Sequence, residues 1–147
     1  MEPDWPVWKE HIESQQIALE KFRRSYQVNR RRYLAQSVLN MDFDARSFDM
    51  AISVNCITQY LDLNADLLRE ATIKAVDVVK PGSRVVYFPF GDGFAPIGDP
   101  RAYFFEHRLR RQNQRQLLGF LDNQDNLTYQ VKPVIGSIHK KLVIVKS

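Results

Sequence analysis

The sequence predicts an α/β fold with a mostly parallel sheet and a C-terminal antiparallel hairpin, and three observations indicate this. Residues 48–54 form an almost continuous apolar run, typical of a strand covered on both faces. A strand, a helix and a second strand follow one another over residues 48–88, the order of a right-handed crossover. Two apolar segments, 127–134 and 142–145, are joined through a Gly-Ser pair and predict the hairpin.

Composition places the chain among folded proteins and excludes several classes. With 147 residues, 44% hydrophobic and 26% charged, it fits one globular domain and neither a disordered tail nor a coiled-coil rod. No apolar run approaches the roughly 20 residues that a bilayer requires, so we expect a cytoplasmic location. The single cysteine, Cys56, rules out an internal disulfide and a CxxC metal site, and we expect it to be a small buried apolar residue.

The first 32 residues predict a helical segment. Asp4 is a plausible N-cap, Pro6 suits the first turn, and apolar residues recur at helical spacing as far as Tyr26. After this segment, residues 33–39 predict a short, mostly apolar strand, although their periodicity is also compatible with a helix.

The central elements have clear boundaries in the sequence. Asn64 predicts the N-cap of a helix that ends at the segment Lys80-Pro81-Gly82. Residues 84–88 predict a buried strand, and Pro89 marks its end because proline cannot donate to a ladder. A loop over residues 91–98 could form a substrate wall, and a long helix is expected from Pro100 to about residue 121.

These motifs resemble class I S-adenosylmethionine-dependent methyltransferases. The segment Ser47-Phe48-Asp49 with its apolar strand, and the later Val79-Lys80-Pro81-Gly82 with a Val-rich strand, are similar to the fourth and fifth strands of that family. The likeness covers about residues 33–147 and implies a Rossmann-like fold. The glycine-rich turn after the family's first strand has no counterpart before Phe48, so the resemblance implies a partial, truncated domain over residues 1–147.

The resemblance also implies positions for a cofactor and a substrate. The cofactor, S-adenosylmethionine, would be held weakly or not at all without the glycine-rich turn. Its expected contacts and those of a methyl acceptor follow the ends of the family's strands: for the cofactor Glu2, Ser37, Val38, Ser53 and Asn55, and for the acceptor Asn55, Gln59, Tyr60 and Phe90. No catalytic residue is predicted.

Each of these residues also has a structural interpretation. Asn55 could cap the next helical turn instead of touching a ligand. Tyr60, next to Leu61, is more often a core residue than a substrate contact. Glu2 is the second residue of the chain and could belong to a frayed terminus. His11, His107 and His139 lie on different elements, so no metal site is expected.

The missing strands have a consequence for the sheet. In the family's order the first two strands lie between the third and the fourth, so strand 48–54 would present a bare apolar edge. Three neighbours could cover that edge: the predicted strand 33–39, a second copy in a homodimer, or a separate partner chain.

Three functions therefore compete. The first is a truncated methyltransferase-like domain of doubtful activity, acting on a small or unknown methyl acceptor. The second is a non-catalytic module that pairs through its sheet edge. The third is nucleic-acid binding by Arg108, Arg111 and Arg115 on the long helix, together with the basic run Arg30–Arg32.

Overall fold

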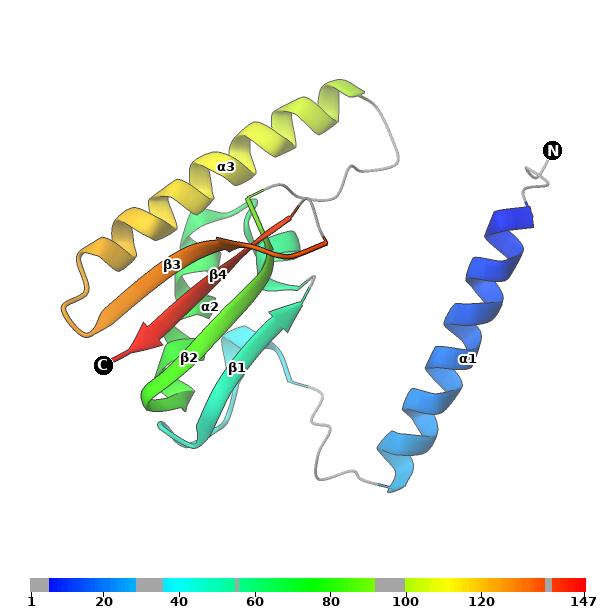
Figure 1. The fold of residues 1–147 in the computed structure, drawn as a ribbon, viewed down its shortest axis with the longest axis horizontal. Coiled ribbons are helices and arrows are strands. Elements are labelled where there is room, and N and C mark those ends of the chain that lie inside the picture. Colours follow the sequence, from blue (N-terminus) through cyan, green and yellow to red (C-terminus); the bar gives the residue numbers. More distant parts are fainter. Residues whose placement is uncertain (1–5, 29–35, 55, 92–99, 137–138) are drawn as a thin grey trace. The chain divides into compact units, whose positions relative to one another are not determined.

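The computed structural model describes residues 6–28, 36–54, 56–91, 100–136 and 139–147 (Figure 1). The chain divides into two compact units, residues 1–36 and 37–147. The first unit contains helix α1 (Pro6–Val28), as the sequence predicts. The second contains the sheet and the other helices. No helix within the described ranges has the length and apolarity needed to cross a membrane.

A four-stranded sheet organises the second unit. Its strands are β1 (Phe48–Val54), β2 (Val79–Phe90), β3 (Leu127–Pro133) and β4 (Lys140–Lys146), in the spatial order β1-β2-β4-β3. Strands β1 and β2 are parallel, and β4 pairs antiparallel with both β2 and β3. The predicted crossover and C-terminal hairpin are confirmed.

Two helices supply the core beside the sheet. Helix α2 (Ala65–Val78) buries Leu68 and Ala71, and helix α3 (Pro100–Asp122) buries Leu117 and Leu121. These side chains join one apolar cluster with Tyr87 of β2 and with Leu142 and Ile144 of β4. The crossover helix therefore lies on the same core as the C-terminal hairpin.

Polar groups complete both ends of α2. At the start, Asn64 Oδ1 accepts hydrogen bonds from the backbone N–H groups of Asp66 at 3.0 Å and Leu67 at 3.1 Å. At the end, the buried Lys146 ammonium donates to the carbonyl oxygens of Val76 at 2.9 Å and Val79 at 3.1 Å. A cation at a helix C-terminus pairs with the carbonyls that lack intrahelical donors.

The strand expected over residues 33–39 is wrong where the structure describes it. Val38–Asn40 forms a single 3₁₀ turn, η2, and residues 33–35 lie outside the described ranges. The cause is local, because Ser37 Oγ accepts the Leu39 N–H at 3.3 Å and the Ser37 carbonyl accepts the Asn40 N–H at 2.9 Å. Serine side chains that bind nearby backbone compete with strand pairing in this way.

Two boundaries around β2 also differ from prediction. Helix α2 ends at Val78, two residues before the expected stop, and β2 starts immediately at Val79. The strand continues past Pro89 to Phe90, with a cis peptide bond between Phe88 and Pro89. The ladder to β4 shifts register between Tyr87 and Phe90, so the proline interrupts the pairing without ending the strand.

Strand β1 has its predicted bounds, but its burial differs from the expectation. The side chains of Met50, Ile52 and Val54 are 46%, 63% and 55% exposed, whereas Ser53 between them is 9% exposed. One face of β1 is therefore covered and the other is open. In the described part of the chain β1 pairs only with β2, so it is the outer strand of the described sheet (Figure 1).

Candidate functional site

The carboxyl ends of β1 and β2 meet at one edge of the sheet, where α/β folds place their ligands. Ser53, predicted to contact a cofactor, lies near the end of β1. Its Oγ accepts the N–H of Ile57 at 3.0 Å, and Ile57 is the first residue of η3 (Ile57–Leu61), the short helical turn after the strand. The hydroxyl therefore joins the end of β1 to this turn. Phe90, predicted to contact substrate, ends β2 with a side chain only 4% exposed, and it belongs to the core.

The structure brings two of the predicted cofactor residues together, but around a small apolar cavity. Val38 and Ser53 line a cavity of about 120 Å³, whose other lining residues come mainly from β1, α2 and β2. Ligand pockets for small molecules usually measure about 300–1,000 Å³. Ser37 is outside this cavity, and its hydroxyl accepts the Leu39 N–H. These residues, as they lie, do not fit a nucleoside cofactor.

The remaining predicted residues divide into two groups. Glu2 and Asn55 lie outside the described residues, so their predicted roles stay predictions. Gln59 and Tyr60 lie within η3, on the turn that follows β1, and their side chains are not among those described. Cys56 is exposed, which corrects the expectation of a buried residue, because it precedes η3 at the end of the edge strand.

A buried polar cluster at this same edge was not visible in the sequence. Asp62 is fully buried; its carboxylate binds the Arg110 guanidinium and accepts a hydrogen bond from Gln114 Nε2 at 3.0 Å. Asn113 Nδ2 donates to the Asp62 carbonyl at 2.8 Å. Burial is the largest effect on the pKa of Asp62 and raises it above its ordinary value, although Arg110 and Gln114 act in the opposite direction.

This cluster holds the segments that border the strand ends. Gln114 Oε1 also accepts the Gly91 N–H at 2.9 Å, directly after β2, where Gly91 has a φ of 105° that favours glycine. Thr58 Oγ1 donates to the Pro89 carbonyl at 2.6 Å and joins η3 to the end of β2. Because each of these groups is hydrogen-bonded within the protein, the cluster ties η3, the end of β2 and α3 together.

A second buried hydroxyl has a similar structural role. Tyr87 OH donates to Thr72 Oγ1 at 3.2 Å, and that hydroxyl donates to the Leu68 carbonyl at 2.8 Å. Burial raises the pKa of the Tyr87 phenol, so the group stays neutral. Tyr87 therefore links β2 to α2 and is not a general base.

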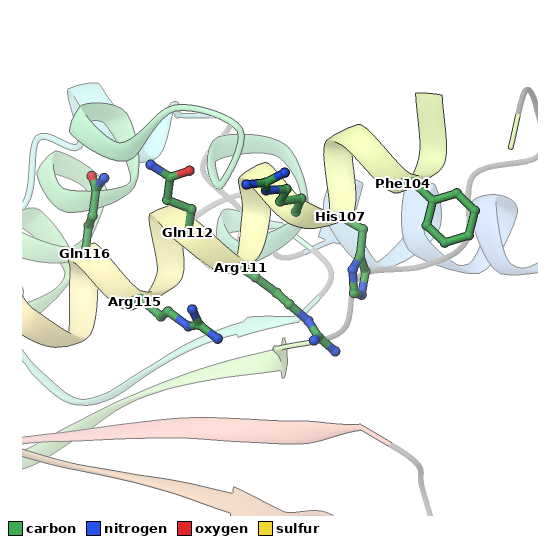
Figure 2. A pocket seen from close by; sticks show the side chains of 7 residues that line it. Phe104, His107, Arg111, Gln112, Arg115 and Gln116 are labelled. Carbon is green, nitrogen blue, oxygen red and sulfur yellow. The ribbon is translucent and has the colours of Figure 1, made fainter. Parts of the chain in front are cut away.

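A hollow lies along the outer side of α3. It measures about 780 Å³ and is lined by side chains from four turns of this helix (Figure 2): Phe104, His107, Arg108, Arg111, Gln112, Arg115 and Gln116. A smaller hollow of about 340 Å³ shares Arg111 and Arg115 and reaches Phe90 and Lys140. Arg108, Arg111 and Arg115 thus lie together on one surface, whereas Arg30–Arg32, the other part of the predicted nucleic-acid surface, lie outside the described residues.

Comparison with known proteins identifies the fold and leaves the family unassigned. No family model matches the sequence. No curated protein matches it either.

Solved structures do match. One is a candidate S-adenosyl-L-methionine-dependent methyltransferase from Methanococcus maripaludis, with a TM-score of 0.52, 14% identity, and coverage of 90% of this chain and 62% of that chain. Another is a SAM-dependent methyltransferase, a candidate histamine N-methyltransferase, from Thermotoga maritima, with a TM-score of 0.46, 17% identity, and coverage of 84% and 69%. A third, a SAM-dependent methyltransferase from Methanosarcina mazei, has a TM-score of 0.43, 11% identity, and coverage of 76% and 65%.

The match to the M. maripaludis protein shows that the chain has the Rossmann-like fold of class I methyltransferases, as the strand motifs suggest. The chain spans less than two thirds of that protein's length. The comparison therefore concerns part of a methyltransferase fold.

Proposed function

We propose that this chain provides the second half of an S-adenosylmethionine-dependent methyltransferase domain and does not bind the cofactor by itself. The observation that carries the proposal is the position of β1. It corresponds to the fourth strand of the resembled family, and its outer edge pairs with no other strand in the described residues. The first strand of the complete fold, with its glycine-rich turn, would lie along that edge.

The cofactor contacts support this division. The Ser37 and Ser53 hydroxyls accept backbone N–H groups, and the cavity that Val38 and Ser53 share is about 120 Å³. A glycine-rich turn would add two or three backbone hydrogen bonds, together about 2–4 kcal/mol. Losing them weakens affinity by roughly thirty- to a thousandfold. We therefore expect cofactor binding to be millimolar or undetectable.

Isothermal titration calorimetry of the full chain with S-adenosylmethionine and S-adenosylhomocysteine tests this proposal. We expect no saturable heat in the micromolar range for either compound. A methyltransferase of known affinity, titrated in the same buffer, is the control for ligand quality. A micromolar dissociation constant would contradict the proposal, because it would require a complete cofactor site within this chain.

The open edge also favours a second candidate, a non-catalytic module that pairs with another polypeptide through β1. Four apolar side chains of this strand are at least one third exposed: Phe48, Met50, Ile52 and Val54. Exposed apolar edge strands are templates for pairing with another chain. A homodimer through β1 is the simplest form, since a two-fold axis pairs identical edges.

Multi-angle light scattering across a concentration series tests the homodimer. We expect a concentration-dependent dimer that is lost in the variant Ile52→Lys, because a charge on the apolar face opposes burial. The matched control is Ile73→Lys, which alters another exposed isoleucine, on α2 away from the edge strand. A strictly monomeric chain would leave pairing with a different partner chain as the only form of this candidate. The predicted cytoplasmic location stays a prediction.

A further inference from the structure

The face of the sheet opposite α2 and α3 is apolar at its centre. On the covered face Ser53, Tyr87 and Leu142 are buried, and the side chains that alternate with them point to the open face. In Figure 1 the strands lie in front of α2, so the open face is toward the viewer. Seven apolar side chains lie on this face, and each is exposed or half-buried: Met50, Ile52 and Val54 of β1, Val86 and Phe88 of β2, and Val143 and Val145 of β4. Apolar patches of this kind mark contacts with other molecules.

Three cations border this apolar centre on the same face. Arg84 of β2 is in register with Met50 of β1 and Val145 of β4. Lys141 of β4 lies directly opposite Lys132 of β3. None of the three cationic side chains forms an ion pair in the described structure. Like charges directly opposite each other on neighbouring strands are destabilising, so a carboxylate beside the two lysines is favourable.

The strands themselves supply no such carboxylate. Asp49 is the one acidic residue among the four strands that the structure describes. Its carboxylate binds Lys80 Nζ at 2.7 Å, near the start of β2. The open face is therefore positive at its border and apolar at its centre. A surface complementary to it has an apolar stripe flanked by carboxylates.

A sheet face and a sheet edge need different covers. At an edge the partner's backbone pairs with the strand, whereas a face offers only side chains. A polypeptide that covers the face therefore has to satisfy its own backbone hydrogen bonds, as a helix does. Strands β1, β2 and β4 span about 10 Å at about 4.8 Å between neighbours, and a helix with its side chains is about 10–12 Å wide. One helix thus covers the apolar centre.

The border charges select the kind of helix that fits. A second copy of the same face would bring cations toward their own counterparts, which is unfavourable for like charges. We propose that the open face binds an acidic amphipathic helix of another polypeptide, whose apolar stripe lies on β1, β2 and β4. Its flanking carboxylates pair with Arg84, Lys132 and Lys141.

This inference rests on the second candidate function, pairing with another polypeptide, and names the chemistry of that partner. Fluorescence anisotropy of the full chain tests it with two fluorescein-labelled helical peptides of about 18 residues, or about 27 Å. Both carry leucine at helical spacing, and the flanking positions are glutamate in one peptide and lysine in the other. We expect saturable binding of the glutamate peptide that weakens with salt, and binding of the lysine peptide that is at least about tenfold weaker.

The double variant Arg84→Glu/Lys141→Glu reverses two of the border charges. We expect it to bind the glutamate peptide at least about tenfold more weakly than wild type, and the lysine peptide more tightly. Its matched control, Arg108→Glu/Arg115→Glu, reverses two exposed arginines of α3 and should alter both affinities less than about twofold, because α3 covers the other face. Ile52→Ala should weaken binding of the glutamate peptide at least about threefold through lost apolar contact. Circular dichroism of each variant establishes that it is folded.

Three outcomes would overturn the proposal. The first is no saturable binding of the glutamate peptide by the wild-type chain, which is also the result expected if a second copy or another part of this chain covers the face. The second is equal affinity for the two peptides, which would refute charge complementarity. The third is equal affinity of the Arg84/Lys141 double variant and its control for the glutamate peptide. None of these outcomes bears on dimerisation through the edge of β1, which light scattering measures, or on the calorimetric test of the cofactor.

Discussion

The two faces of the sheet have similar side chains and opposite environments. On one face Ser53, Tyr87 and Leu142 stand in register across β1, β2 and β4, and all three are buried. On the other face Ile52 is in register with Val86 and Val143, yet Ile52 is 63% exposed. The helices α2 and α3 account for the difference, since they cover only the first face in the described structure.

An apolar sequence shows that a strand face can be buried. It does not show whether another element covers that face. A strand that is apolar on both faces suits the centre of a layered α/β fold. In this chain α2 and α3 cover one face of the sheet, and no described helix of the same unit covers the other face. The energetic consequences of substitutions should therefore differ sharply between the two faces.

The largest effect is expected on the covered face. Leu68 of α2 is fully buried in the core, so Leu68→Ala should lower the free energy of unfolding by about 2–5 kcal/mol. Urea denaturation followed by circular dichroism measures this loss. A loss below about 1 kcal/mol would show that α2 does not pack on the sheet as described.

A smaller but substantial effect is expected at the end of α2. Lys146→Met keeps most of the apolar stem and removes the ammonium that binds the Val76 and Val79 carbonyls. We expect a loss of about 1–3 kcal/mol, because buried acceptors lose a charged donor. The matched control is Lys141→Met on the same strand, which should change stability by less than about 0.5 kcal/mol. Equal effects of the two substitutions would contradict the capping role.

The raised pKa of Asp62 predicts how its contribution to folding stability changes with pH. Burial raises its folded-state pKa above the ordinary 3.8, so the folded protein holds this proton more tightly than the unfolded chain. The Asp62 contribution to stability is thus most favourable below the unfolded pKa and is lost as pH rises through the folded pKa. Comparing wild type with Asp62→Asn across that acid range checks the sign, and an Asp62 contribution that instead grows with pH would contradict the raised pKa.

The smallest effect is expected on the open face. Ile52→Ala should lower the free energy of unfolding of the monomer by less than about 1 kcal/mol, because the side chain already contacts water. The same urea measurement, made at a concentration where the chain is monomeric, compares it directly with Leu68→Ala. A loss as large as that of Leu68→Ala would mean that the face is covered in solution.

Local signals in the sequence were sufficient for much of the fold. The apolar run of β1, the Asn64 cap of α2 and the two strands of the hairpin are each specified by adjacent residues. The strand predicted over residues 33–39 is wrong at Val38 and Leu39, because a short apolar run does not separate strand from helix and the Ser37 side chain binds the Leu39 N–H within the turn.

The site was less predictable because its contacts are distant in sequence. Asp62 meets Arg110 and Gln114 about 50 residues later, and Lys146 reaches the end of α2 across about 70 residues. No spacing rule links such pairs before the fold brings them together. The sequence could group Arg108, Arg111 and Arg115 because they lie on one predicted helix at spacings of three and four residues.

Residue-resolved amide hydrogen exchange along β1, measured on the monomer, tests the central claim of an open sheet edge most directly. Amides of an edge strand in a parallel pair alternate between the neighbouring strand and solvent. We therefore predict alternating protection along Phe48–Val54 and continuous protection along the centre of β2, which has neighbours on both sides. Uniform strong protection along β1 would contradict the account, because a further strand would then have to occupy that edge.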